Sequence, residues 1–172
     1  MKLKSFTILS SLLLLSACAQ PLSWTEMSPR VDLFDQLSPN TYREKIMLGD
    51  VIISEDAGKD TIVTEDGYRS VLSVSLREAN LYEVPAKAAY RLEATLQEFD
   101  VPFALFNTTV HARADYILYN NSKNSVVYQE TVNVPCTVRF AEQINADLRL
   151  RQAYGCAVGE NISHLLNVLS RK

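Results

Sequence analysis

The alternation of apolar and polar residues predicts four strands. Residues 46–54 (IMLGDVIIS) are almost continuously apolar and rich in β-branched side chains, which is typical of a strand buried on both sides. Residues 90–99 alternate strictly, as in a strand with one buried face. A second alternating run, 110–118, leads through a polar stretch into a third, 126–134, which Pro135 ends. These two runs predict a β-hairpin with a loop of about five residues.

Two other stretches have the three- and four-residue spacing of helices. The first covers 64–82, starts with a capping threonine and two acids, and ends before Pro85. The second runs from about 140 to 169 and contains Gly155 and Gly159, whose spacing predicts close packing of this helix against the sheet. The order β-α-β-β-β-α predicts an α+β fold, a two-layer sandwich in which a four-stranded mixed or antiparallel sheet carries both helices on one face.

Residues 1–17 predict a signal peptide. Lys2 and Lys4 form a basic start, and the apolar stretch 6–15 that follows is about half the roughly 20 residues needed to span a bilayer. Small residues then precede Cys18. An ordinary secretory leader with an incidental cysteine is the alternative interpretation.

The segment LSAC at residues 15–18 resembles the lipobox of bacterial lipoproteins. The resemblance implies cleavage before Cys18, a thioether-linked diacylglycerol on its sulfur, and acylation of the new amino terminus. Two or three acyl chains would hold the protein on a membrane durably. By the sorting rule known for Gram-negative lipoproteins, Ala19 in place of Asp implies the outer membrane, with the protein facing the periplasm.

The mature chain is predicted to consist of a tether and one domain. Residues 18–45 contain three prolines and no sustained periodicity, so we expect a lipidated terminus and a flexible tether reaching about 30 Å. Trp24, Leu33 and Phe34 are large apolar groups for a linker and favour packing on the domain, with the lipid headgroups or a partner as alternatives. Residues 46–172 predict a single α+β periplasmic domain.

Cys136 and Cys156 predict a disulfide, because an even pair in an exported chain usually forms one. The two cysteines lack the CxxC or HxxxH spacing of a zinc site. A reactive thiol is disfavoured too, since no flanking His or Lys would lower its pKa.

Composition narrows the class of protein. The 172 residues are 47% apolar and 22% charged, which excludes wholesale disorder and a multi-span membrane protein. The formal charge is −3, and loss of Lys2 and Lys4 with the leader would bring it near −5. This balance disfavours nucleic-acid binding.

The sequence predicts no catalytic residues, no metal site and no cofactor, and so no enzyme. Phosphate-binding glycine motifs, HExxH and GxSxG are all absent from it. His111 lies beside Arg113 and Asp115 on the polar side of a predicted strand. A solvated or partner-facing position is favoured there over a catalytic triad. His164 is predicted to border the apolar face of the last helix, and the acids at 65–66 to start a helix.

The most informative candidate site is the sheet face that two helices would leave uncovered. We interpret it as a surface for a protein partner, with a simple water-facing sheet as the alternative. Its predicted polar side chains are Arg91, Glu93, Thr95, Gln97, His111, Arg113, Asp115, Gln129 and Thr131.

The chain resembles small envelope lipoproteins of Gram-negative bacteria, including auxiliary lipoproteins of ABC-type transport systems and the lipopolysaccharide-assembly lipoprotein. The resemblance rests on the lipobox at 15–18, the alternating stretch 90–94, the hairpin 111–130 and the closing stretch 159–172. No early strand enters directly from Cys18, which is a departure from the assembly lipoprotein.

This resemblance implies a non-enzymatic adaptor or accessory subunit of an envelope transport or assembly complex. A periplasmic carrier of lipids or small molecules is one alternative, and an apolar cavity would favour it. An activator of cell-wall synthesis acting by protein contact is another. A hydrolase would require His111 within hydrogen-bond reach of a serine in a cleft.

Overall fold

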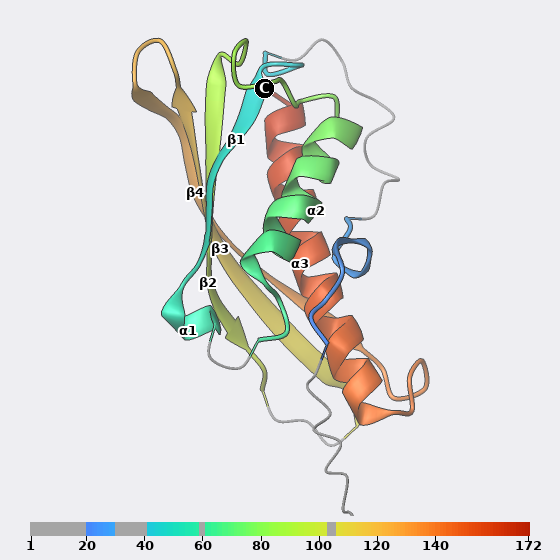
Figure 1. The fold of residues 1–172 in the computed structure, drawn as a ribbon. Coiled ribbons are helices and arrows are strands. Elements are labelled where there is room, and N and C mark those ends of the chain that lie inside the picture. Colours follow the sequence, from blue (N-terminus) through green and yellow to red (C-terminus); the bar gives the residue numbers. More distant parts are fainter. Residues whose placement is uncertain (1–19, 30–40, 59–60, 103–105) are drawn as a thin grey trace, which may run out of the picture.

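The computed structural model describes residues 20–29, 41–58, 61–102 and 106–172. Its centre is a four-stranded sheet in the order β1-β2-β3-β4, with α2 and α3 on the same face (Figure 1). The predicted two-layer α+β sandwich is confirmed. The elements are η1 (Trp24–Glu26), β1 (Ile46–Ile53), α1 (Glu55–Gly58), α2 (Glu65–Glu78), β2 (Tyr90–Asp100), β3 (Thr108–Asn120), β4 (Ser125–Val138) and α3 (Ala146–Ser170).

The sheet is mixed. β1 pairs with β2 in parallel, because the chain crosses over through α2 between these two strands. β2 with β3, and β3 with β4, pair antiparallel. The predicted hairpin is β3–β4, and its turn is four residues long, ending at Asn124, whose φ of 46° is left-handed.

Two strand predictions were wrong in detail. β1 is not buried on both sides, since Asp50 and Ile52 on it are exposed, the latter to 49%. β4 also does not end before Pro135 but continues to Val138. Proline is tolerated here because β4 is an edge strand, where a missing backbone N–H need not break a ladder bond.

The helices are shorter than their apolar patterns suggest. α2 ends at Glu78, and Asn80, with a φ of 54°, turns the chain away two residues later. α3 begins only at Ala146, because the side chain of Asn145 caps it by accepting from the backbone amides of residues 147 and 148.

A polar network lies within the otherwise apolar layer between sheet and helices. The hydroxyls of Tyr68 on α2 and Tyr116 on β3 are 2.9 Å apart, and Tyr116 donates to Asn161 Oδ1 on α3 at 2.8 Å. The Asn161 amide donates to the backbone carbonyls of Ala112 and Val132. Burial raises the pKa of both tyrosines, so the network is neutral. It ties four elements together, α2, β3, β4 and α3.

The disulfide expected from the two downstream cysteines is formed. Cys136 lies on β4 and Cys156 on α3, with their Cα atoms 5.8 Å apart. It therefore links the last helix covalently to the edge of the sheet.

Residues 20–29 do not form the predicted flexible tether but pack on the domain. Leu22 and Met27 are buried in the core, and the Leu22 amide donates to the carbonyl of Ile62. Tyr42, at the other end of the predicted tether, is also buried. The signal peptide, Cys18, Ala19, Leu33 and Phe34 lie outside the described residues.

The prediction that Gly155 and Gly159 pack against the sheet was wrong, because both glycines contact this N-terminal segment. A Cβ atom at position 155 would overlap the carbonyl oxygen of Glu26, and one at 159 would lie 3.0 Å from that of Ser28. Both glycines therefore let the backbone of 26–28 lie directly on α3.

Candidate functional site

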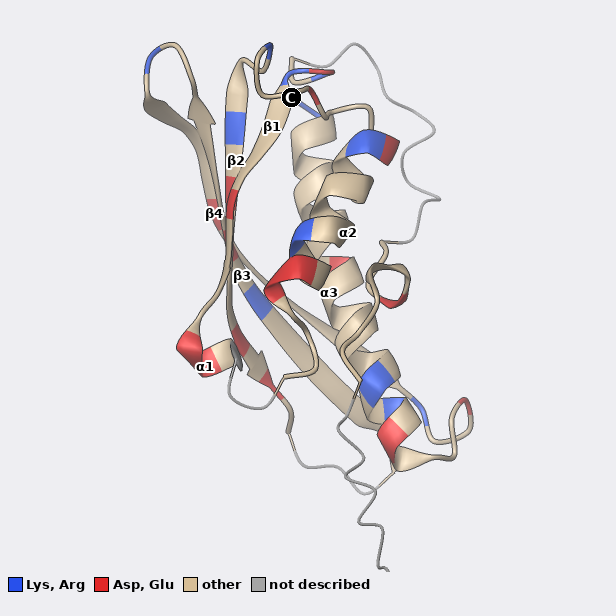
Figure 2. Ribbon diagram, viewed as in Figure 1, with Lys and Arg blue, Asp and Glu red and all other residues tan. Residues whose placement is uncertain are grey.

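The outer face of the sheet, opposite α2 and α3, carries the predicted polar residues. Figure 2 shows positively and negatively charged positions interspersed along the strands. Of the nine predicted side chains, Arg113, Gln129 and Thr131 are exposed and the other six are half-buried. In β2 and β3 the polar residues lie between positions that are almost fully buried. The side-chain alternation of a strand therefore places all of them on one surface, as expected.

One row of hydrogen bonds crosses three strands of this outer face. Gln97 on β2 donates to Asp115 Oδ2 on β3 at 2.7 Å, and Thr131 on β4 donates to Asp115 Oδ1 at 2.6 Å. Both carboxylate oxygens of Asp115 are thus held by side chains of neighbouring strands.

Two ion pairs flank this row. Arg91 Nε lies 3.0 Å from Glu93 Oε1, and the Arg91 guanidinium stacks on the ring of Tyr119 at 4.9 Å from its centroid. Arg113 Nη2 lies 2.8 Å from Glu98 Oε2, with both side chains nearly half exposed. Glu98 was not among the predicted residues, because strict alternation would place it on the inner face.

A β-bulge explains the position of Glu98. The register shifts between Leu96 and Glu98, so Glu98 lies opposite Arg113 and Phe99 turns to the inner face. There the Phe99 ring packs edge-on against Tyr154 of α3. The bulge thus adds an acid to the outer face without losing the core contact.

His111 lines a shallow pocket of about 120 Å³ at one end of this face. The other lining residues are Glu98, Asp100, Arg113 and Asn133. None of them carries a hydroxyl or thiol, so the lining lacks the nucleophile that a hydrolase of the serine type would need. The arrangement can form hydrogen bonds and ion pairs with a partner, which is binding chemistry.

His164 does not lie in a site with His111. It is exposed on α3 and its Nε2 lies 3.0 Å from Glu130 Oε1 on β4. A hydrogen bond from the Tyr128 hydroxyl is the largest cause that lowers the pKa of Glu130, and the bond to His164 adds to it. These contacts fasten the edge strand to the helix layer.

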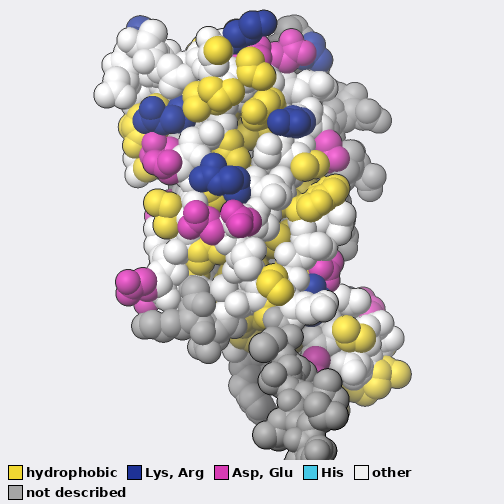
Figure 3. All heavy atoms as spheres, in the orientation of Figure 1, with side chains coloured by type: hydrophobic (Ala, Val, Ile, Leu, Met, Phe, Trp, Pro, Cys, Tyr) yellow, Lys and Arg dark blue, Asp and Glu magenta, His cyan; other side chains and the backbone are white. Residues whose placement is uncertain are grey.

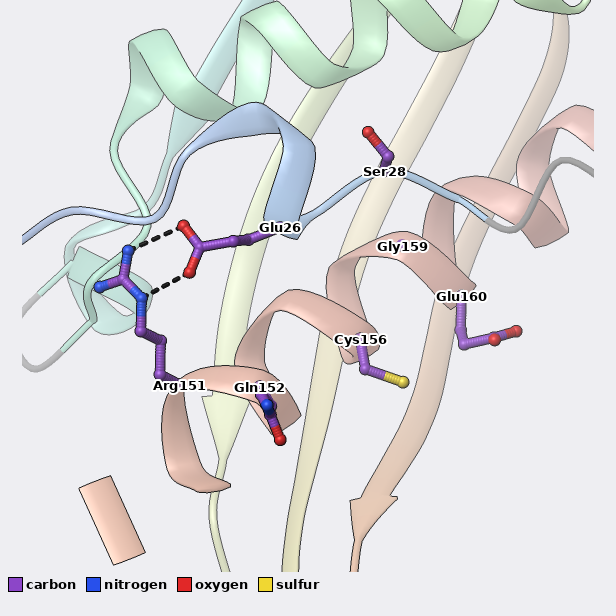
Figure 4. Close-up of a pocket in the computed structure, with 7 residues that line it drawn as sticks. All are labelled: Glu26, Ser28, Arg151, Gln152, Cys156, Gly159 and Glu160. Atoms are coloured by element: carbon purple, nitrogen blue, oxygen red, sulfur yellow. Dashed lines mark hydrogen bonds and ion pairs between the residues drawn. The ribbon is translucent and has the colours of Figure 1, made fainter. Parts of the chain in front are cut away.

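A second structured site holds the N-terminal segment on α3 (Figure 4). Arg151 forms a bidentate pair with Glu26, with Nε and Nη2 at 2.6 and 2.8 Å from the two carboxylate oxygens. The same guanidinium donates to the backbone carbonyls of Gln20 and Pro21. The hydrogen bond from Arg151 is the main cause that lowers the pKa of Glu26, to about 2.

Nothing in the sequence around Glu26 marks it as the partner of Arg151. The two residues are 125 positions apart, and the local pattern of 20–29 has no helical or strand period. The apolar side chains at positions 22, 24 and 27 are the one available signal that this segment is not a free linker.

The larger pockets are open and bordered by charged residues. One of about 280 Å³ lies beside the segment on α3 and includes Glu26, Arg151 and Glu160. Another of about 450 Å³ lies over α2 and includes Trp24, Arg69 and Arg77. Neither has the enclosed apolar lining expected of a lipid carrier.

Across the described ranges, His, Cys, Asp and Glu side chains form no group of three or more that could hold a metal ion. Among the helices of those same ranges, none combines the length and apolarity required to cross a bilayer.

The fold is similar to that of several bacterial proteins of known structure. No family model matches the chain, and no curated protein matches its sequence. A crystal structure of a DUF330-family protein from Xanthomonas campestris superposes with a TM-score of 0.62 at 12% identity, covering 83% of this chain and 93% of that one.

Two solved lipoprotein structures are also similar in fold. The minor lipoprotein of Acinetobacter baumannii gives a TM-score of 0.52 at 13% identity, over 77% of this chain and 94% of that one. A predicted lipoprotein of Caulobacter crescentus gives 0.50 at 16% identity, over 73% and 88%. At these identities the likeness establishes a shared fold, which is the fold of proteins that include lipoproteins of Gram-negative bacteria.

Proposed function

We propose that this protein is a lipid-anchored lipoprotein of the bacterial envelope, held on the outer membrane through Cys18 and facing the periplasm. It acts as a non-enzymatic adaptor or accessory subunit of a transport or assembly complex. The outer face of the sheet is its partner-binding surface. The lipobox and the shared fold with lipoproteins support the anchor.

The observation that carries the adaptor role is the polar outer face itself. Gln97, Arg113 and Asp115 are prearranged there by bonds to neighbouring strands, and Arg91 by an ion pair with Glu93 on its own strand. These side chains therefore lose little freedom when a partner docks. Both signs of charge are present, which favours specificity and orientation over broad attraction. The pocket at His111 adds further hydrogen-bonding and charged groups to this surface.

Site-specific photo-crosslinking in intact cells tests this surface. A benzophenone amino acid replaces Gln129, which is exposed on the outer face, in the full chain with its own leader. We expect a crosslink to a defined component of an envelope transport or assembly complex. The same probe at Ser70, exposed on α2, is the matched control and should give none.

Charge reversal at Arg113 then tests whether a single residue of the outer face contributes to binding the partner. Arg113→Glu places a second acid beside Glu98 and should abolish the crosslink from position 129. Arg43→Glu, an equal charge change at an exposed residue of the turn before β1, should leave it intact. Equal crosslinking from positions 129 and 70, or indifference to Arg113→Glu, would refute the outer face as the binding surface.

The anchor has its own experiment. Cells grown with labelled palmitate should incorporate label into the wild-type protein and none into Cys18→Ser. Label retained by the Cys18→Ser variant would contradict the proposed anchor.

A further inference from the structure

Four large apolar side chains project from one end of the molecule. Phe106, Phe140, Ile144 and Leu148, here called the apolar tip, are exposed to 68, 44, 73 and 49%. The rings of Phe106 and Phe140 pack edge-on with centroids 6.4 Å apart. Figure 3 shows apolar side chains on the lobe at the lower right, where Figure 1 places the start of α3. A cluster of this kind on a small protein marks a surface that meets something apolar.

The apolar tip is rigidly supported. The largely buried Arg149 donates to the carbonyls of Gln143 and Ile144 and to the hydroxyl of Thr108. Its guanidinium also lies 5.5 Å from the centre of the Phe140 ring. One side chain thus holds the loop before α3 to the start of β3, so the apolar residues are presented on a fixed platform.

The N-terminal segment begins close to this apolar tip. Arg151, one helical turn after Leu148, holds the carbonyl of Gln20. Cys18 is two residues before Gln20, and two residues of extended chain span at most about 7 Å. Any acyl chain on Cys18 therefore enters its membrane next to this end of α3.

We propose that the apolar tip inserts into the headgroup region of the same membrane that holds the lipid on Cys18. This inference rests on the proposed lipidation. Aromatic and branched aliphatic side chains are the groups that partition into this region. Exposed charges around the tip are of both signs, with Arg139 next to Glu142 and Asp147, so the contact is hydrophobic and does not require anionic lipid.

The contact fixes the orientation of the domain. The lipid and the apolar tip are two attachment points at one end, and the β3–β4 turn lies at the other, about 40 Å away along β3. The outer face of the sheet then stands away from the bilayer, accessible to a partner from the side.

A depth-sensitive fluorophore tests the contact in the full-length lipidated protein. Cys18 is blocked by lipid and the other two cysteines are paired, so Ile144→Cys supplies one free thiol for an NBD label. The protein is reconstituted into vesicles of phosphatidylethanolamine and phosphatidylglycerol containing nitroxide-labelled lipid. The matched control is Ser122→Cys in the exposed β3–β4 turn.

We expect the label at 144 to emit at shorter wavelength and to be quenched several-fold more than the label at 122, equally at low and high salt. Adding Phe106→Asp and Leu148→Asp should remove most of that quenching while the protein still floats with the vesicles. Equal quenching at 144 and 122 in floating protein overturns the tip contact alone. A blue shift without quenching means that protein covers the tip, and also overturns it. If the wild-type protein does not float with the vesicles, both the proposed lipid anchor and the tip contact are wrong.

Discussion

Both faces of the sheet carry polar networks, and the two networks have opposite consequences. On the inner face, Tyr68, Tyr116 and Asn161 are almost fully buried and satisfy one another and two backbone carbonyls. On the outer face, Gln97 and Thr131 hold both oxygens of a half-exposed Asp115. Bond lengths are similar on the two faces, but water can replace a lost partner only on the outer one.

The difference separates stability from interaction. A buried group that loses its partner keeps the full cost of its desolvation, whereas an exposed pair contributes little. The inner network is therefore part of what holds the layers together, and the outer one can be altered to study binding without unfolding the domain. Five predictions test this contrast.

Asn161→Ala should have the largest effect, a loss of about 4 kcal/mol in the free energy of unfolding. The variant removes three hydrogen bonds and leaves the carbonyls of Ala112 and Val132 without their side-chain donor. Denaturant unfolding measures it as a lower midpoint with an unchanged slope. Asn133→Ala on the outer face is the control. Equal losses in the two variants would show that inner and outer polar residues contribute equally to stability.

Breaking the disulfide should cost about 3 kcal/mol, given a loop of 20 residues and the chain-entropy account. Replacing Cys136 and Cys156 by Ala frees α3 from β4 and exposes the inner face more readily. Unfolding of wild type with and without reductant should match this loss, and reductant should not affect the double variant. An unchanged midpoint in the double variant would show that the layers hold without the link.

Arg151→Ala should cost about 1 kcal/mol and release the N-terminal segment. Trp24 is the only tryptophan of the chain and lies within that segment, so its emission should shift to longer wavelength. Arg171→Ala, at the exposed end of α3, should leave the emission unchanged.

The same contact should respond to pH. The pKa of Glu26 is about 2 in the folded protein against an ordinary 4.5, so its contribution is complete above 4.5 and is lost as the pH falls towards 2. Trp24 emission should follow this window in wild type. Glu26→Gln should remove that transition, and a transition that persists in Glu26→Gln would assign it to another group.

Asp115→Ala should have the smallest effect, below about 1 kcal/mol, although it removes two hydrogen bonds. Its readout is the crosslink from position 129, which should weaken while the unfolding midpoint hardly moves. A loss as large as that of Asn161→Ala would mean that the outer network is structural.

Local periodicity predicted most of the fold. Strand residues alternate between faces, so the patterns of 90–97 and 110–118 were enough to assign inner and outer positions. The extension of β4 through Pro135 could not be predicted, because the place of a strand at a sheet edge is a property of the assembled sheet. The bulge that turns Glu98 outward depends likewise on its pairing with β3.

The sequence predicted the candidate site that depends on side-chain alternation within strands, and missed the one that joins distant segments. The outer face follows from side-chain alternation, and its predicted members share one surface. The Glu26–Arg151 pair joins residues 125 positions apart. The sequence around Gly155 and Gly159 likewise does not indicate which segment packs against them. Contacts between distant segments are set by the whole fold and leave little trace in either segment alone.

The docking of residues 20–29 on α3 has a consequence for the order of folding. Glu26 precedes its partner Arg151 by 125 positions, so the contact cannot form before α3 exists. Until the surface around Gly155 and Gly159 is in place, Leu22 and Met27 lack a complete binding groove, and residues 20–29 stay accessible to proteases. Closure of this long-range contact is therefore expected to be a late step of folding.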